Sequence, residues 1–177
     1  MKTLTNLSRW IFGLVFIFSG FVKGIDPWGL EYKLADYLPS MGLGSLRFLA
    51  TAGSYILPLA EFLIGAAMLL CVRIRLSSLL GLIFMAFFTP FTLYVAIKNP
   101  VTDCGCFVDA MLITNWETFY KNILLSAMVL LVYIRREGIQ PVILGKWRYY
   151  RMAIITTIYI GFVTWSYRHD PVFYFRP

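Results

Sequence analysis

Two cysteines separated by one glycine, Cys104-Gly105-Cys106, have the spacing in this sequence that points most directly to chemistry. A disulfide needs its two Cα atoms about 4.4–6.8 Å apart, and a fully extended pair at this spacing lies near 7 Å, at up to about 3.6 Å per residue. Gly105 supplies the backbone freedom for the turn that joins the sulfurs. A ring that closes so little chain gives little entropic stabilisation. Strained or exposed disulfides are typically the labile, catalytic ones, so the pair predicts thiol-disulfide exchange.

Metal binding and a purely structural role are the alternatives for this pair. A Cys-X-Cys sequence offers two soft thiolates to copper(I) or zinc, but a closed zinc site requires four ligands. The third cysteine, Cys71, falls at the far end of a predicted membrane span, and the single histidine, His169, lies near the C-terminus. We therefore predict a redox pair without a metal, in which Cys104 and Cys106 are candidate catalytic residues.

Glu61 is the second candidate, because it falls in the middle of a long apolar segment. A charge at the centre of a membrane helix costs about 2.5–3.5 kcal/mol, and such acids usually face a bundle interior or a cavity. Pro58, one turn earlier, removes a backbone hydrogen bond and favours a kink. We predict a functional role for Glu61; the alternative is a protonated carboxyl group that joins helices by hydrogen bonds.

Other polar side chains gather in the half of the apolar segments that lies nearest the cysteines. Their common level predicts a polar pocket that opens beneath the cysteine loop. The alternative is that the hydroxyl groups bond only to their own helices. The set comprises Ser19, Lys23, Thr51, Ser54, Tyr55, Thr89, Thr92, Tyr94, Lys121 and Asn122.

Membrane-spanning helices must position these residues. Apolar residues make up 59% of the chain and charged residues 14%, against about 45–50% and 25% in soluble domains. The mean hydropathy is +0.72, which indicates lipid as the surrounding solvent, where helices satisfy the backbone. With about 20 apolar residues needed per crossing, we predict an all-α integral membrane helical bundle. Its four-helix core has spans at 7–22, 46–72, 76–97 and 116–134, and a fifth transmembrane helix follows at 150–167.

The chain forms one bundle rather than separate soluble domains. We assign 1–135 to the four-helix core with the cysteine loop, and 136–177 to a basic loop, the fifth helix and a short external tail. Asp26-Pro27 predicts the start of a short amphipathic helix in the membrane interface, which ends at Pro39; a mere connector is the alternative. Thr114 and Glu117 match a capping box that opens the fourth span.

Loop charges set the predicted orientation in a bacterial inner membrane. The positive-inside rule places the N-terminus in the cytoplasm and the Cys-Gly-Cys loop in the periplasm, where oxidising conditions permit disulfides. The net charge of +7 is explained by basic loops that touch lipid headgroups, so nucleic acid is not expected as a partner. The predicted inner side has one acid, Glu137, and the bases Lys2, Arg9, Arg73, Arg75, Arg135, Arg136, Lys146, Arg148 and Arg151.

The order of several short motifs resembles the DoxX/MauE superfamily of small bacterial membrane proteins, over most of residues 1–135. MauE-like members are associated with disulfide formation or thiol-electron transfer to exported proteins, often near thioredoxin-like partners, and DoxX-like members with a quinol-oxidising complex. The resemblance therefore implies membrane redox chemistry in a Cys-Gly-Cys-Phe subgroup. The matching runs are Arg9 with Ser19-Gly20 and Lys23, Asp26-Pro27, Pro58-Leu59-Ala60-Glu61 with Gly65, and Asp103-Cys104-Gly105-Cys106-Phe107; relatives often have glycine where this chain has Val108.

Residues and resemblance together predict a membrane thiol-disulfide electron-transfer protein that acts on exported thiol partners and is linked to a quinone or a second redox partner. Cys104, Cys106 and Glu61 are its candidate catalytic residues. The alternatives are a membrane scaffold or assembly subunit with structural cysteines, and a small-solute or metal-ion carrier. An external region follows the last span in some similar proteins, so the chain is a candidate part of a longer protein. The predicted quinone contacts are Lys23, Tyr55, Glu61 and Tyr94.

Overall fold

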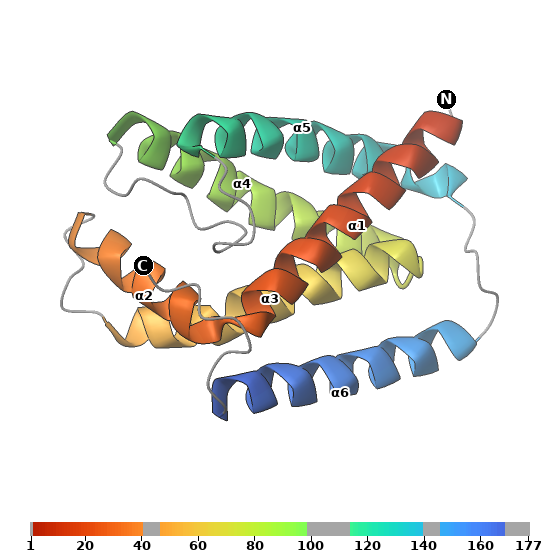
Figure 1. The fold of residues 1–177 in the computed structure, drawn as a ribbon. Coiled ribbons are helices and arrows are strands. Elements are labelled where there is room, and N and C mark those ends of the chain that lie inside the picture. Colours follow the sequence, from red (N-terminus) through yellow and green to blue (C-terminus); the bar gives the residue numbers. More distant parts are fainter. Residues whose placement is uncertain (1, 41–46, 99–113, 140–145, 169–177) are drawn as a thin grey trace.

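The computed structural model of the chain describes residues 2–40, 47–98, 114–139 and 146–168 (Figure 1). Within these ranges the protein is all-α and contains no strand. Four helices, α1, α3, α4 and α5, are long and apolar enough to cross a membrane, which confirms the predicted membrane bundle. The elements are α1 (Lys2–Ile25), α2 (Pro27–Ser40), α3 (Phe48–Leu69), α4 (Ile74–Lys98), α5 (Asn115–Ile134), the 3-10 helix η1 (Arg136–Gly138) and α6 (Trp147–Arg168).

The antiparallel helices α1 and α3 form the closest pair, because glycines let their backbones meet. A Cβ atom on Gly20 would lie 2.7 Å from both the Pro58 carbonyl oxygen and the Phe62 nitrogen. A Cβ atom on Gly65 would lie 2.7 Å from the carbonyl oxygen of Gly13. Small residues at such crossings are the usual way in which membrane helices gain van der Waals contact. This contact fixes the register that decides which polar residues of α1 and α3 face each other.

The core lies where this pair packs against the antiparallel pair α4 and α5. Membrane helices are held together mainly by such packing, since lipid gives no hydrophobic drive for helices to associate. Large apolar side chains also point outward, such as Phe87, which is 65% exposed. That outer surface suits contact with lipid, whereas soluble monomers rarely expose large apolar patches. The buried core consists of Phe12, Phe16, Ile64, Met68, Met85, Leu125, Val129 and Val132.

Helix α2 begins as predicted and ends one residue later than predicted. The Asp26 side chain accepts a hydrogen bond from the Gly29 backbone N–H at 2.8 Å, which is an N-cap. Pro39 was predicted to end the helix, but it lies inside the last turn, before Ser40. The prediction was wrong because a proline near a helix C-terminus removes only one backbone bond, and helix ends are fixed only to within one or two residues.

Helix α6 packs against α1, α2 and α3, on the other side of α1 and α3 from the α4–α5 pair (Figure 1). Two hydrogen bonds join it to α1. The Tyr159 hydroxyl donates to the Gly20 carbonyl oxygen at 2.6 Å, and the Ser166 hydroxyl donates to the Ile25 carbonyl oxygen at 2.5 Å. Its 22 residues span about 33 Å at roughly 1.5 Å per residue. The predicted fifth helix is therefore formed beside the core, and its crossing of the membrane stays a prediction.

Candidate functional site

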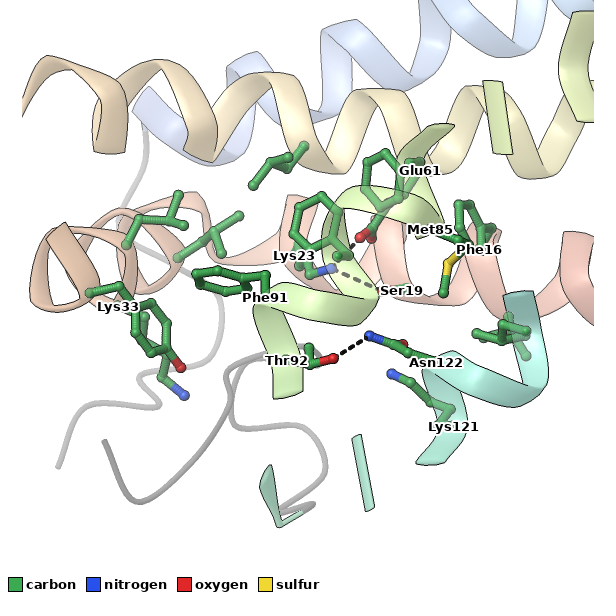
Figure 2. Close-up of a pocket in the computed structure, with 18 residues that line it drawn as sticks. Phe16, Ser19, Lys23, Lys33, Glu61, Met85, Phe91, Thr92, Lys121 and Asn122 are labelled. Carbon is green, nitrogen blue, oxygen red and sulfur yellow. Dashed lines mark hydrogen bonds and ion pairs between the residues drawn. The ribbon is translucent and has the colours of Figure 1, made fainter. Parts of the chain in front are cut away.

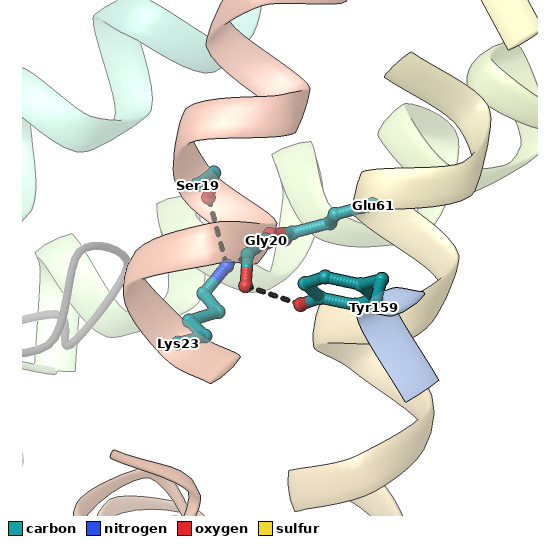
Figure 3. Close-up of polar contacts among 5 residues, drawn as sticks. All are labelled: Ser19, Gly20, Lys23, Glu61 and Tyr159. Atoms are coloured by element: carbon teal, nitrogen blue, oxygen red, sulfur yellow. Dashed lines mark hydrogen bonds and ion pairs between the residues drawn. The ribbon is translucent and has the colours of Figure 1, made fainter. Parts of the chain in front are cut away.

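A buried ion pair joins α1 to α3 at the centre of the bundle. The Lys23 Nζ atom lies 2.5 Å from Glu61 Oε1, and the two side chains are 8% and 7% exposed. Lys23 also donates to the Ser19 hydroxyl at 3.1 Å, one turn back along α1 (Figure 3). Long side chains of helices point toward the helix N-terminus, so the amine is directed from the end of α1 down to the level of Glu61. The Glu61 side chain is thus paired with a basic side chain of the neighbouring helix.

The second carboxylate oxygen of Glu61 takes no part in the ion pair with Lys23. Glu61 Oε2 is buried and has no hydrogen-bond partner within the described ranges. A buried charged group that lacks a partner is costly, and a bound water is the usual remedy where a polar recess has room for one. Glu61 thus presents an acceptor atom to whatever occupies the space next to it.

That space is a pocket between α1, α2, α3, α4 and α5 (Figure 2). Its free volume is about 60 Å³, which is room for several water molecules at roughly 10–15 Å³ each. Its lining includes the polar side chains of Lys23 and Glu61, and aromatic and aliphatic side chains such as Phe16, Phe91 and Met85. The arrangement therefore places an ionisable pair against a small recess that can hold water.

Thr92 and Asn122 close the polar side of the pocket between α4 and α5. Asn122 donates from Nδ2 to Thr92 Oγ1 at 3.2 Å, and both residues are buried. Helix α5 opens with the predicted capping box, in which the Thr114 hydroxyl accepts from the Glu117 backbone N–H at 3.3 Å. At this end of the bundle α4 ends at Lys98 and α5 begins at Asn115.

The structure brings together some of the predicted site residues and separates others. Tyr55 packs against Tyr167 of α6 with the two rings tilted and their centroids 4.5 Å apart, and Tyr94 packs against the cluster of Tyr37 and Val95. Neither tyrosine lines the pocket within the described ranges, so the predicted contact set of Lys23, Tyr55, Glu61 and Tyr94 reduces to the ion pair there. The predicted catalytic cysteines, Cys104 and Cys106, lie outside the described residues. The predicted polar residues that do line the pocket are Ser19, Lys23, Thr92, Lys121 and Asn122.

Sequence reasoning missed the contribution of α2 and α6 to this site. Leu30 and Tyr37 of α2 are 4% and 5% exposed and, with Lys33, line the pocket instead of facing lipid. Their helical spacing was the available signal, but it does not tell whether an apolar face meets lipid or protein. Tyr159 of α6 lies next to the ion pair through its bond to Gly20 (Figure 3).

Comparison with known proteins bears on what this site does. A family model described as "Methylamine utilisation protein MauE" matches residues 1–135. The chain belongs to the MauE family. The match to MauE covers all four candidate spans, α2 and the Lys23–Glu61 pair, and it leaves α6 outside. No curated protein and no solved structure matches the chain. MauE membership and the four apolar helices together identify a membrane protein that contacts the lipid bilayer.

Proposed function

We propose that this MauE-family protein is a membrane thiol-disulfide electron-transfer protein, in which Cys104 and Cys106 exchange electrons with exported thiol proteins. The observation that carries the proposal is the buried Lys23–Glu61 pair beside a recess with room for water. Ionisable residues inside membrane spans are costly, and they mark proton or ion pathways. Oxidation of two thiols releases two protons with two electrons, so a thiol redox site benefits from an adjacent group that holds protons.

In the proposed exchange, one cysteine pair begins as a dithiol and the other as a disulfide. A thiolate of the reduced pair attacks one sulfur of the oxidised pair, and the other sulfur leaves as a thiolate. The second thiolate of the attacking pair then breaks the mixed disulfide. One dithiol is oxidised and one disulfide is reduced, with two electrons transferred. In the proposal, Glu61 and Lys23 take up or return the accompanying protons through water in the recess.

Chain connectivity supports the nearness of the cysteines to this recess. Cys104 follows Lys98, the last residue of α4, by six positions, which limits its Cα atom to about 22 Å from that of Lys98 at roughly 3.6 Å per residue. We place this loop on the periplasmic side of a bacterial inner membrane, because the opposite end of the bundle carries most of the basic residues. We propose exported thiol proteins of methylamine utilisation as the first partners to test, since the family name refers to that process.

We propose no quinone step at the pocket of the Lys23–Glu61 pair. The free volume of about 60 Å³ lies well below the roughly 300–1,000 Å³ of typical ligand pockets. No step of the proposal therefore passes through a quinone, and the second redox partner is a further dithiol or disulfide protein. The predicted quinone link stays a prediction, which measurement of the quinone content of protein purified in mild detergent would check.

Trapping of mixed disulfides tests the proposed exchange. Cys104→Ser and Cys106→Ser each leave one thiol in the loop, so one of them is expected to accumulate a partner adduct that a reducing agent releases. Cys71→Ser keeps both loop cysteines and is the matched control, from which no adduct is expected. Absence of any adduct from both loop variants would contradict the proposal. A scaffold with structural cysteines would instead keep both partner binding and biological activity in both serine variants.

A further inference from the structure

A second and wider hollow lies at the opposite end of the bundle, where α3 ends and α4 begins. It is an open hollow with a free volume of about 580 Å³, which falls within the roughly 300–1,000 Å³ of typical ligand pockets. The turn before α4, the first two turns of α4, the residue after η1 and the start of α6 line it. It shares no lining residue with the pocket of the Lys23–Glu61 pair within the described ranges. A ligand there would act independently of the proposed thiol exchange.

Two arginines, Arg73 and Arg75, give this hollow its charge. Both are exposed, and within the described ranges neither has a carboxylate oxygen within 4.0 Å. Arg73 has a φ of 44°, in the left-handed region that residues other than glycine rarely adopt. Backbone strain of this kind recurs at ligand-binding sites. The two guanidinium groups are therefore available for an anion, and arginine matches phosphate particularly well because its planar fork donates two parallel hydrogen bonds.

The surroundings of the two arginines add to this preference for an anion. Glu137 is the one acid at this end of the bundle within the described ranges, and it does not line the hollow. An anion that enters thus meets an excess of positive charge. The other basic residues at this end are Lys2, Arg9, Arg135, Arg136, Lys146 and Arg151.

Apolar side chains form the remaining wall and decide between a free anion and a lipid. Leu76 and Leu79 of α4 and Ile139 after η1 line the hollow, and Leu76 is 45% exposed. The remaining lining residues are Cys71, Ile74 and, in α6, Tyr149, and tyrosine is enriched at membrane–water interfaces. A free phosphate ion gains nothing from aliphatic walls, whereas a phospholipid carries its phosphate and its acyl chains together. Basic recesses between membrane helices are known binding sites of anionic lipid headgroups.

We propose that this hollow binds one anionic phospholipid, with its phosphate on Arg73 and Arg75 and an acyl chain along Leu76, Leu79 and Ile139. The lipid contacts both the start of α4 and the start of α6. It thereby holds α6 on the bundle at the end opposite to the one where α4 leads into the Cys-Gly-Cys loop.

Thermal unfolding of the full chain in detergent, titrated with phosphatidylglycerol, tests the proposal. The wild type is expected to gain thermal stability from phosphatidylglycerol at concentrations where phosphatidylcholine and inorganic phosphate give none. Arg73→Gln with Arg75→Gln is expected to lower the apparent affinity for phosphatidylglycerol about 25-fold, at roughly fivefold per arginine. The matched control, Lys146→Gln with Arg151→Gln, removes two exposed bases at the same end that do not line the hollow. That control is expected to keep most of the affinity.

Three results would overturn the proposal. Equal stabilisation by phosphatidylcholine would show that the phosphate charge is not recognised, and equal stabilisation by inorganic phosphate would show an ion site without a lipid. Equal loss of affinity in the control pair would show a diffuse surface charge effect. If the double arginine variant fails to fold, two single variants replace it. Arg75→Gln removes half of the positive charge, and Leu79→Trp fills the space proposed for the acyl chain. Unchanged affinity in both of these would also contradict the proposal.

Discussion

Helix α1 carries two buried cations, and the bundle accommodates them in different ways. Arg9, which is 2% exposed, donates from one guanidinium nitrogen to the carbonyl oxygens of Met68 and Leu69 at 3.2 Å and contacts the Cys71 sulfur. Those carbonyls end α3, where the helix dipole favours a positive charge. Lys23 instead meets the carboxylate of Glu61 in the middle of α3.

This difference separates a cation that completes the fold from one that is placed for chemistry. A helix C-terminus needs donors for its last carbonyl groups, so Arg9 satisfies a requirement that the fold itself creates. Nothing in the α1–α3 packing requires an ion pair at the level of Glu61, where two apolar side chains would serve as well or better. Each site leaves one buried atom without a hydrogen-bond partner in the described structure, Arg9 Nε and Glu61 Oε2, but it is Glu61 that lines the recess with room for water.

Removal of one partner of the ion pair is expected to have the largest effect on stability. Glu61→Gln leaves a buried ammonium group without its counter-charge and should lower the free energy of unfolding by about 3–5 kcal/mol, measured in mixed detergent micelles. Lys23→Met combined with Glu61→Leu should return it to the wild-type value or above, because apolar replacements of buried ion pairs are often neutral or stabilising. Wild-type stability of Glu61→Gln would show that the pair is not buried as described.

Arg9→Met should cost less, about 2–3 kcal/mol, because it removes hydrogen bonds from a charged donor to carbonyl groups at a helix end. The same unfolding measurement applies. Thiol exchange per folded molecule should stay unchanged, since Arg9 lies at the opposite end of α1 from Lys23. A large loss of exchange with unchanged stability would reverse the roles assigned here to the two cations.

Gly20→Ala tests the helix contact that sets the register of the pair. The added methyl group meets backbone atoms of α3 at 2.7 Å, and such overpacking typically costs about 1–3 kcal/mol. Gly161→Ala is the control, since a Cβ atom at Gly161 meets nothing within 4 Å and alanine favours a helix by up to about 1 kcal/mol over glycine. Equal behaviour of the two variants in unfolding would refute the close α1–α3 contact.

Tyr159→Phe should have the smallest effect, a loss of about 0.5–1.5 kcal/mol for one hydrogen bond. It removes the donor to the Gly20 carbonyl oxygen and loosens α6 from α1. Tyr150→Phe, at an exposed position of the same helix, is the control and should leave the unfolding free energy unchanged. No difference between the two variants would mean that α6 is not held at Gly20.

Local features of the fold could be predicted from the sequence, and the contacts of the site could not. The span predicted at 76–97 is observed as Ile74–Lys98, and both Asp26 and Thr114 cap the helices that they precede. These features depend on apolar length and on neighbouring residues. Lys23 and Glu61 were each selected, but their pairing depends on the α1–α3 register, which comes from glycine contacts between distant parts of the chain.

The depth of a residue in the membrane also did not predict whether it lines the pocket, because that depends on the side of the helix on which the residue lies. Tyr55 and Tyr94 were placed with Lys23 because they share a level in the membrane, yet Tyr55 packs against Tyr167, Tyr94 packs against the cluster of Tyr37 and Val95, and neither tyrosine lines the pocket within the described ranges. Apolar residues surround these helices on every side, so the sequence pattern does not distinguish a side that faces the pocket from a side that faces lipid. The buried position of Arg9 was not predicted for the same reason.

Infrared difference spectroscopy of the purified protein tests most directly whether the buried pair serves the thiol chemistry. Spectra of the oxidised and the reduced protein are compared for wild type and Glu61→Gln, with Cys104→Ser combined with Cys106→Ser as the redox-inactive control. We predict a carboxyl or carboxylate band that changes with the redox state in the wild type and is absent from both variants. A Glu61 band that stays the same on reduction would contradict a role of the Lys23–Glu61 pair in thiol exchange.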